Sequence, residues 1–158
     1  MGAPGQVRAD ASKNRELIID ELDRMVALAE QARSEETWAW DSLSRFAHDC
    51  AELRLDVLQA VAGPPAPEID AKRARLLEAL GRIVDAAHKE GALRPDVGSG
   101  DVLGVVGLLV RGLPTLSAGL GEELRDRAVR LVLAGMRAHP APEPPGTALT
   151  AEELIRRV

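Results

Sequence analysis

The feature that most constrains the fold of this chain is a helical spacing of apolar residues that returns in one segment after another. Apolar side chains recur every three or four residues, which places them on one face of an α-helix. No segment shows the alternation of a strand over a convincing length. The sequence therefore predicts an all-α fold, a helical bundle of about five main helices, over residues 12–33, 38–61, 71–90, 101–113 and 122–138.

Glycine, proline and a capping aspartate set the ends of these helices. The Gly-Pro-Pro-Ala-Pro run at 63–67 terminates the second helix, because proline removes a backbone donor and clashes with the preceding turn. Asp70 is expected to cap the third helix. Gly91 supplies the left-handed residue that commonly follows the last turn of a helix, so we expect the third helix to end there.

The length of 158 residues fits a single ordinary domain, which we expect to span residues 19–139. Residues 1–18 precede this domain. Residues 140–158 form a proline-rich tail. Within the tail, a Thr-x-x-Glu capping box predicts a short terminal helix over residues 151–157.

Charge and composition exclude several classes of protein. The formal net charge is −5, so the chain offers no broad basic field for nucleic-acid phosphates. A single cysteine, Cys50, excludes an internal disulfide and suits a reducing cytoplasm. No apolar run reaches the length of about 18 residues that a membrane span needs, and no signal-peptide pattern follows the first methionine. We therefore expect a cytoplasmic protein without membrane contact.

Three arrangements could carry chemistry, and each has a simpler explanation. His48 and Glu52 lie one helical turn apart, but a site with only two ligands is rare and a solvated pair is the simpler interpretation. His48, Asp49 and Cys50 are consecutive in a helix, so their side chains diverge by about 100° per residue and form no nucleophilic relay. The Gly-Ser-Gly run at 98–100 lacks the strand and the lysine of a phosphate loop. We expect no catalytic residue, metal ligand or cofactor.

The last two long helices carry more apolar surface than the other three helices can cover. The helix over 101–113 has apolar side chains all round, which predicts burial on all sides, and the helix over 122–138 has two apolar faces. The surplus predicts a self-associating, two-fold interface, and the alternative is that it forms the core of the monomer. At this interface we expect glycines that let two helix backbones approach closely and apolar side chains that fill the space between them. These residues are Gly104, Gly107, Gly135, Val106, Leu109, Val132 and Met136.

Several motifs resemble the C-terminal half of TetR-family transcriptional regulators, in particular an SbtR-like actinobacterial branch. The Gly-Ala-Leu-Arg-Pro-Asp sequence at 91–96 is similar to the Gly-x-Leu-Arg-x-Asp connector of the family, and Asp101 opens the next helix as it does there. Residues 130–137 and 149–154 look like the final helix and tail of that branch. The resemblance implies a homodimer built from the last two long helices and a small-molecule pocket among the central helices, whose occupation releases operator DNA.

The N-terminal residues resemble the start of the DNA-binding head of the same family. Residues 8–18 look like the opening of the first helix of the head, but the helix-turn-helix that should follow is not found. Residues 22–32 already resemble the long helix that comes after the head. We interpret residues 1–18 as a remnant of the head or a disordered tail. DNA binding is expected only if a partner or a longer gene product supplies a helix-turn-helix.

The pocket is predicted between the helices over 38–61 and 71–90, because their apolar stripes mix large and small residues. Such a pocket suits an apolar or amphipathic ligand that is held mainly by burial. Trp38 and Trp40 begin the first of these helices and are expected to serve packing. The residues expected to line the pocket are Phe46, Cys50, Leu53, Leu80, Val84 and Ala87, with Arg54 and His88 as polar anchors at the edges of the stripes.

The sequence thus predicts the effector-sensing and dimerisation domain of a TetR-like transcriptional regulator without a complete helix-turn-helix. The alternative is a ligand-free interaction domain that heterodimerises with an intact regulator and modulates it. An enzyme is disfavoured, because the sequence shows no acid–base or nucleophile arrangement.

Overall fold

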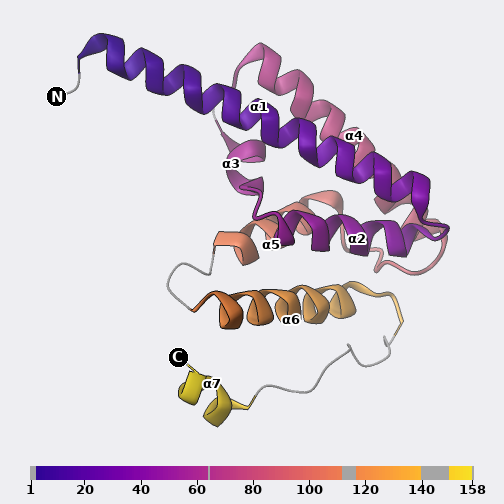
Figure 1. Cartoon of the computed structure of the whole chain (residues 1–158). Helices are drawn as coiled ribbons and strands as arrows, with labels where there is room; N and C mark the ends of the chain where they lie inside the picture. Colours follow the sequence, from indigo (N-terminus) through magenta and orange to yellow (C-terminus); the bar gives the residue numbers. More distant parts are fainter. Residues whose placement is uncertain (1–2, 64, 112–116, 140–149, 158) are drawn as a thin grey trace.

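Figure 1 shows a computed structural model of the chain, which describes residues 3–63, 65–111, 117–139 and 150–157. The described residues form helices and no strand, apart from one isolated antiparallel bridge, which confirms the all-α prediction. The predictions for residues 112–113 and 140–149 lie outside the described residues. The helices are α1 (Pro4–Glu35), α2 (Ala39–Glu52), α3 (Val57–Ala62), α4 (Pro67–Lys89), α5 (Ser99–Arg111), α6 (Ala118–Met136) and α7 (Ala151–Arg157).

The first helix is longer than predicted. It was expected from residue 12 but begins at Pro4, because proline is well accommodated in the first helical turn, where its missing N–H is not needed. The apolar stripe predicted for it is confirmed, since it is buried from Ile18 to Ala32. Residues 4–17 are exposed, and Figure 1 shows this half of α1 projecting beyond the other helices.

The single helix predicted over 38–61 is wrong, because the structure divides it into α2 and α3. The division follows Leu53, where the chain turns and the side chain of Leu55 is buried at 2% exposure. The carboxylate of Asp56 then accepts a hydrogen bond from the Gln59 amide (3.2 Å), which caps the start of α3. Arg111 of α5 binds the same carboxylate (3.0 Å), so a distant helix helps to hold the break in place.

The helix predicted over 71–90 begins four residues early, at Pro67, and the cap assigned to Asp70 is wrong. Ala66 is the N-cap and has no polar side chain with which to cap the helix, but Pro67 at its start has no N–H that would need a partner. Asp70 instead pairs with Arg73 one turn later, at 3.1 Å. Gly91 adopts a φ of 70°, which confirms the predicted left-handed residue after the last turn.

Figure 1 shows α1 and α4 side by side, with α2 and α5 beneath them and α6 beneath these. α2 is the central helix, since it contacts α1, α4, α5 and α6. One apolar cluster runs from the α1–α4 contact through α2 to the inner faces of α5 and α6. The fully buried Phe46 of α2 is the bulkiest of its deeply buried side chains. The core therefore depends on α2 for its continuity.

The short terminal helix α7 is present with the bounds predicted for it. Its capping box is also confirmed, because the Glu153 amide donates to Thr150 Oγ1 (3.2 Å) and the Thr150 amide donates to the Glu153 carboxylate (3.3 Å). Arg157 pairs with Glu123 of α6, with a guanidinium nitrogen 3.0 Å from a carboxylate oxygen. This ion pair places α7 beside the start of α6 (Figure 1).

Candidate functional site

The predicted pocket wall between α2 and α4 forms part of the continuous core. Phe46 and Cys50 of α2 and Leu80, Val84 and Ala87 of α4 are each at most 3% exposed and belong to one apolar cluster. The structure thus brings together five of the six apolar residues that were expected to line a pocket. Because all five are buried, a ligand would reach them by moving α2 away from α4.

Leu53 and Arg54 lie in a different environment, on the surface turn after α2. Leu53 is the C-cap of α2 and is 45% exposed. Arg54 is exposed and adopts a φ of 52°, a left-handed conformation that residues other than glycine seldom adopt. The Leu55 amide still donates to the Cys50 carbonyl (3.1 Å), which closes the turn. Leu53 and Arg54 therefore border the predicted pocket from outside.

The thiol of Cys50 is buried and protonated at neutral pH. Burial, and then the charge of Asp49, raises its pKa from 9.0 to about 12. A thiolate is the nucleophilic form of cysteine, so this thiol is inert in the folded chain.

His88, proposed as a polar anchor, already binds the connector that follows α4. Its Nε2 donates to the Val97 carbonyl (2.9 Å) and lies 3.2 Å from the Arg94 carbonyl. The connector in turn joins the end of α6, because the Arg94 amide donates to the Met136 carbonyl (2.9 Å). The same contact region contains the bridge between Leu93 and Arg137. The Gly-x-Leu-Arg-x-Asp motif therefore ties the end of α4 to the end of α6.

The same region also fixes the start of α2. The Glu90 carboxylate accepts hydrogen bonds from the amides of Ala39 (2.6 Å) and Trp40 (3.3 Å), two donors that a helix N-terminus leaves unpaired. The Arg137 guanidinium lies 4.8 Å from the centroid of the Trp40 ring, a cation–π contact. Trp40 is thus a packing residue, as predicted.

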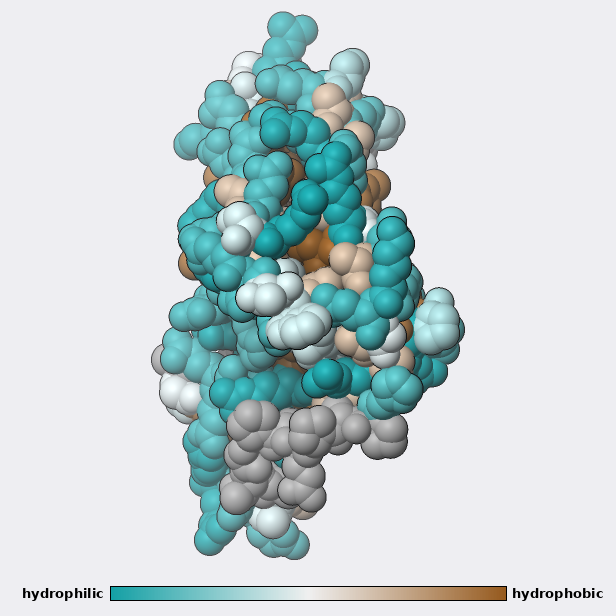
Figure 2. Space-filling view, turned by 90° about the vertical axis from the view of Figure 1, so that its right-hand side faces the viewer, coloured by the Kyte–Doolittle hydropathy of each residue, from teal (hydrophilic) through white to brown (hydrophobic). Residues whose placement is uncertain are grey.

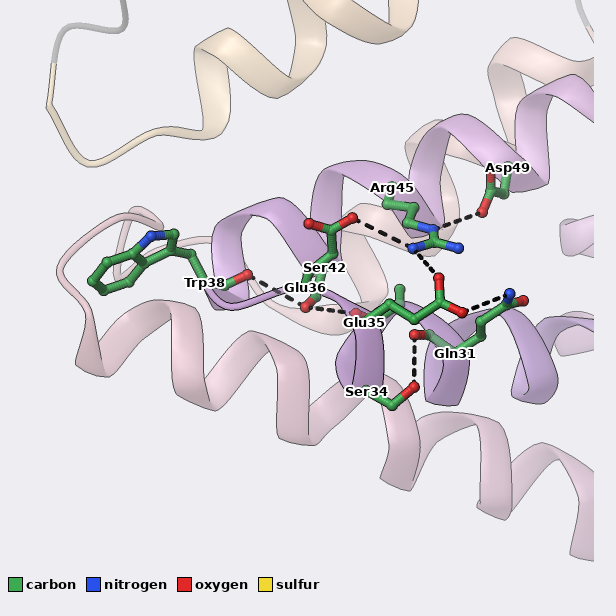
Figure 3. Close-up of polar contacts among 9 residues, drawn as sticks. Gln31, Ser34, Glu35, Glu36, Trp38, Ser42, Arg45 and Asp49 are labelled. Carbon is green, nitrogen blue, oxygen red and sulfur yellow. Dashed lines mark hydrogen bonds and ion pairs between the residues drawn. The ribbon is translucent and has the colours of Figure 1, made fainter.

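A polar cluster holds the corner between α1 and α2 (Figure 3). The Arg45 guanidinium lies 2.6 Å from the Glu35 carboxylate and 3.7 Å from the Asp49 carboxylate. Hydrogen bonds from Gln31 and Arg45 lower the pKa of Glu35. Figure 3 also shows that the Trp38 carbonyl accepts a hydrogen bond from Ser42 (3.3 Å) while its indole ring lies away from the cluster, and the residue is 62% exposed. The packing role expected for Trp38 is therefore wrong, because no helix in the described part of the chain covers the residue.

The side chains predicted at the dimer interface line the inner faces of α5 and α6. Val106 is 4% exposed and Met136 is 8% exposed, while Leu109 and Val132 are partly buried against the same core. These four residues border a small apolar void of about 10 Å³ between α2, α5 and α6. Within the single chain, these side chains therefore pack α5 and α6 against the core.

The three glycines predicted at the interface differ in their surroundings. A Cβ atom at Gly107 would lie 2.5 Å from Leu58 Cγ, so this glycine permits α3 to pack against α5 within the chain. A Cβ atom at Gly104 or Gly135 would meet no atom within 4 Å. Gly104 and Gly135 therefore face open space.

Two exposed leucines lie beside these open glycines, and sequence reasoning missed both. Leu108 of α5 is 66% exposed and follows Gly104 by one helical turn, so the two share a face. Leu131 of α6 is 50% exposed and precedes Gly135 by one turn. The prediction that α5 is buried on all sides is wrong within this chain, because no described element covers Leu108. The signal that identifies this face is a run without a single charged residue, 102–110.

Hollows in the described part of the chain lie away from the predicted pocket. A groove of about 250 Å³ between α1 and α4 is lined by charged side chains over a base of small residues: Ala29, Glu30, Arg33, Arg75, Glu78, Ala79 and Arg82. Figure 2 shows one side of the molecule, which is mostly hydrophilic, with some hydrophobic surface in a hollow between hydrophilic side chains. A second groove lies between α2 and α6.

No group of three or more His, Cys, Asp or Glu side chains within the described ranges is placed to hold a metal ion. None of the described helices combines the length and the apolar character that crossing a membrane requires.

Comparison with known proteins identifies the family. Residues 37–138, more than half of the chain, match a family model described as the C-terminal domain of SbtR-like transcriptional regulators. A search of curated proteins found no match. The match begins just before α2 and ends just after α6, so it covers the central helix, the connector and the last two long helices. The chain therefore belongs to the TetR family of transcriptional regulators, and residues 37–138 form its SbtR-like C-terminal domain.

Proposed function

We propose that this chain is the effector-sensing and dimerisation domain of a TetR-like transcriptional regulator, and that α5 and α6 form the dimer interface. The observation that carries the proposal is apolar surface on both helices that no described residue covers: Leu108 with Gly104 on α5, and Leu131 with Gly135 on α6. Exposed apolar surface of this kind commonly marks a protein–protein interface. Family membership supports the same assignment, since regulatory domains of this family typically dimerise.

A second copy of the chain is the occupant that fits this face best. Most homodimers have two-fold symmetry, so each protomer presents the same patch and each leucine occurs twice in the interface, once from each protomer. The open space at Gly104 and Gly135 allows the backbone of a partner helix to approach closely. Val106 and Met136 are buried inside their own chain, where they would fix the positions of α5 and α6 in the interface.

The interface is tested by placing a charge on it. Leu108→Glu puts a carboxylate at a position that is 66% exposed in the single chain, so the monomer can solvate it and still fold. In a dimer the same change buries two unpaired charges, which is strongly destabilising. We expect the variant to sediment as a monomer and to keep its helical circular dichroism.

The matched control is Leu77→Glu, which introduces the same charge at another exposed leucine, 45% exposed on the charged outer face of α4. This control should sediment as the unmodified chain does. If Leu108→Glu and Leu77→Glu have the same sedimentation coefficient at every concentration, α5 does not contribute to an interface.

We also propose that an apolar or amphipathic effector binds between α2 and α4, beside Phe46, Cys50 and Leu80. The support is a wall of buried apolar side chains between two helices that are joined to each other by Glu90 and, through the connector that His88 binds, to the end of α6. Separating α2 from α4 would therefore act on α6. A ligand that binds only the native state raises the apparent melting temperature. Screening apolar metabolites by thermal shift identifies candidates.

The reactivity of Cys50 tests whether a candidate ligand binds at this site. It is the single cysteine of the chain and is fully buried, so its rate of reaction with a thiol reagent reports the opening of the α2–α4 contact. A ligand bound there should change this rate severalfold. A ligand that raises the melting temperature but leaves the Cys50 rate unchanged binds elsewhere and argues against this pocket.

A further inference from the structure

The groove between α2 and α6 contains a buried positive charge that has no partner among the described residues. This groove has a volume of about 250 Å³ and is lined by residues from the last turns of α2 and the first turns of α6: His48, Ala51, Glu52, Glu122, Arg125, Asp126 and Val129. Arg125 is 8% exposed, and its buried Nη1 atom has no hydrogen-bond partner. No described residue pairs with its guanidinium. A buried ion that is neither paired nor hydrogen-bonded is costly, so an anionic group is missing from this position.

The acidic residues of the groove do not supply that group. Asp126 is engaged by Arg130 (2.9 Å) and lies 3.7 Å from His48 Nδ1. Glu52 of α2 and Glu122 of α6 are exposed and form no ion pair within the described part of the chain. The groove therefore presents a buried positive charge together with two unpaired carboxylates, one from each helix.

These charges select the chemistry of a ligand. A simple anion would neutralise Arg125 but would be repelled by Glu52 and Glu122. A simple cation would suit the two carboxylates but would leave the guanidinium unpaired. A small molecule that carries both charges satisfies both, since its carboxylate can form charge-assisted hydrogen bonds with Arg125 while its ammonium faces the glutamates.

The remaining surface of the groove is apolar and limited in size. Ala51 and Val129 are each 2% exposed and provide apolar wall. The volume of about 250 Å³ lies below the range of pockets that hold drug-sized molecules. The ligand is therefore a small metabolite with room for a short aliphatic group.

We propose that the α2–α6 groove binds a neutral α-amino acid with an aliphatic side chain. Its carboxylate pairs with Arg125, its ammonium with Glu52 and Glu122, and its side chain lies on Ala51 and Val129. This site is separate from the effector pocket proposed between α2 and α4 and does not depend on it. It joins the central helix to a helix of the proposed dimer face.

Isothermal titration calorimetry with three related compounds tests the proposal. Leucine carries both charged groups, isocaproate retains the carboxylate alone, and isoamylamine retains the ammonium alone, while the aliphatic part stays similar. We expect saturable binding of leucine, and binding at least about tenfold weaker for each of the other two, since a lost charged contact leaves a buried partner unpaired.

Variants of the groove identify the residues responsible. Arg125→Met removes the guanidinium but keeps an unbranched side chain, and replacing an unpaired buried charge by an apolar group preserves folding. It should weaken leucine binding at least about tenfold, and Glu52→Gln with Glu122→Gln should weaken it about as much. Arg82→Met removes the same charge from the exposed face of α4 and should bind leucine as the unmodified chain does.

Several outcomes would overturn the proposal. It fails if leucine at millimolar concentration gives no saturable heat with the folded, unmodified chain. It also fails if isocaproate binds as tightly as leucine, since the carboxylates of Glu52 and Glu122 would then play no part. Retained leucine binding in Arg125→Met places the ligand elsewhere. None of these results bears on the Cys50 assay, so the two proposed sites stand or fall separately.

Discussion

The α1–α4 half of the molecule and the α5–α6 half use apolar residues differently. The outer face of α4 is charged, with Arg75, Glu78 and Arg82 exposed and Lys72 paired with Asp23 of α1 (2.6 Å), and its apolar stripe is buried in the core. α5 has no charged residue between Val102 and Val110, and it buries only its inner side. The described residues therefore cover the apolar surface of the first half but leave apolar surface of the second half exposed.

This difference between the two halves indicates where a partner protein is expected to bind. Isolated exposed leucines occur in both halves, for example Leu77 on α4 and Leu108 on α5, and exposure alone does not distinguish them. Their surroundings do, because Leu77 lies among charged side chains and Leu108 lies in a segment without charged residues, 102–110, with an open glycine one turn away. An uncharged outer face, rather than a single exposed leucine, indicates an interface.

The largest effect is expected from truncating the centre of the first half. Phe46→Ala removes the bulkiest deeply buried side chain and leaves a cavity, which should lower the free energy of unfolding by about 3–5 kcal/mol. Leu77→Ala, on the solvent face of α4, should change it by less than about 0.5 kcal/mol. Urea unfolding at a fixed protein concentration compares them. Similar losses for the two variants would mean that the core is not centred on α2.

A smaller effect should distinguish glycines in the two halves. Gly107→Ala forces a Cβ against Leu58, 2.5 Å from its Cγ, so it should lower the free energy of unfolding by about 1–3 kcal/mol. Gly81→Ala meets nothing within 4 Å on α4 and should raise it by about 0.4–1 kcal/mol, because alanine loses less entropy in a helix. Thermal unfolding of both variants checks the signs. A stabilising Gly107→Ala would show that α3 does not pack closely on α5.

The buried thiol predicts an alkaline loss of stability. Because burial raises the pKa of Cys50 from 9.0 to about 12, the folded chain holds this proton at pH values where the unfolded chain releases it. The stability that it contributes is fully present below pH 9.0 and falls between there and about pH 12, by at most about 1.4 kcal/mol per pH unit. Urea midpoints measured on either side of pH 9.0 test this. Cys50→Ala should show a shallower alkaline decline, and an identical decline would exclude the thiol as its source.

The smallest of these effects concerns the hydrogen bonds that join the end of α4 to the start of α2. Glu90→Ala removes the carboxylate that caps α2 through the Ala39 and Trp40 amides, which should cost about 1 kcal/mol. Tryptophan fluorescence should shift at the same time, since Trp40 loses a neighbour. Lys89→Ala, beside it in sequence, provides the control. If Glu90→Ala is no more destabilising than Lys89→Ala, the connector does not fix the start of α2.

Much of the fold could be predicted from local pattern, and the exceptions depend on distant residues. The stripe from Ile18 to Ala32 and the left-handed Gly91 are properties of a single segment, so the sequence shows them directly. The break after α2 was missed because it is held by Asp56 with Arg111, which lie 55 positions apart. The orphaned charge of Arg125 was missed for a similar reason, since its burial depends on how α6 packs against α2.

The candidate site was predicted to a similar extent. The buried wall formed by Phe46 and Leu80 follows from two apolar stripes that must face each other. The exposure of Leu53 could not be foreseen, because it results from the turn that ends α2. The uncovered face of α5 was anticipated as a surplus of apolar surface, but its position at Leu108 rather than Val106 depends on which side of the helix meets the core.

The most direct test of the central claim, that a second copy covers the face of α5 and α6, is the mass of the unmodified chain in solution by light scattering. A single chain has a mass of 16.9 kDa. The account predicts a monodisperse species of twice this mass at micromolar concentration, because an exposed face of this kind is stable when paired. A monodisperse species of 16.9 kDa at the same concentration would contradict it.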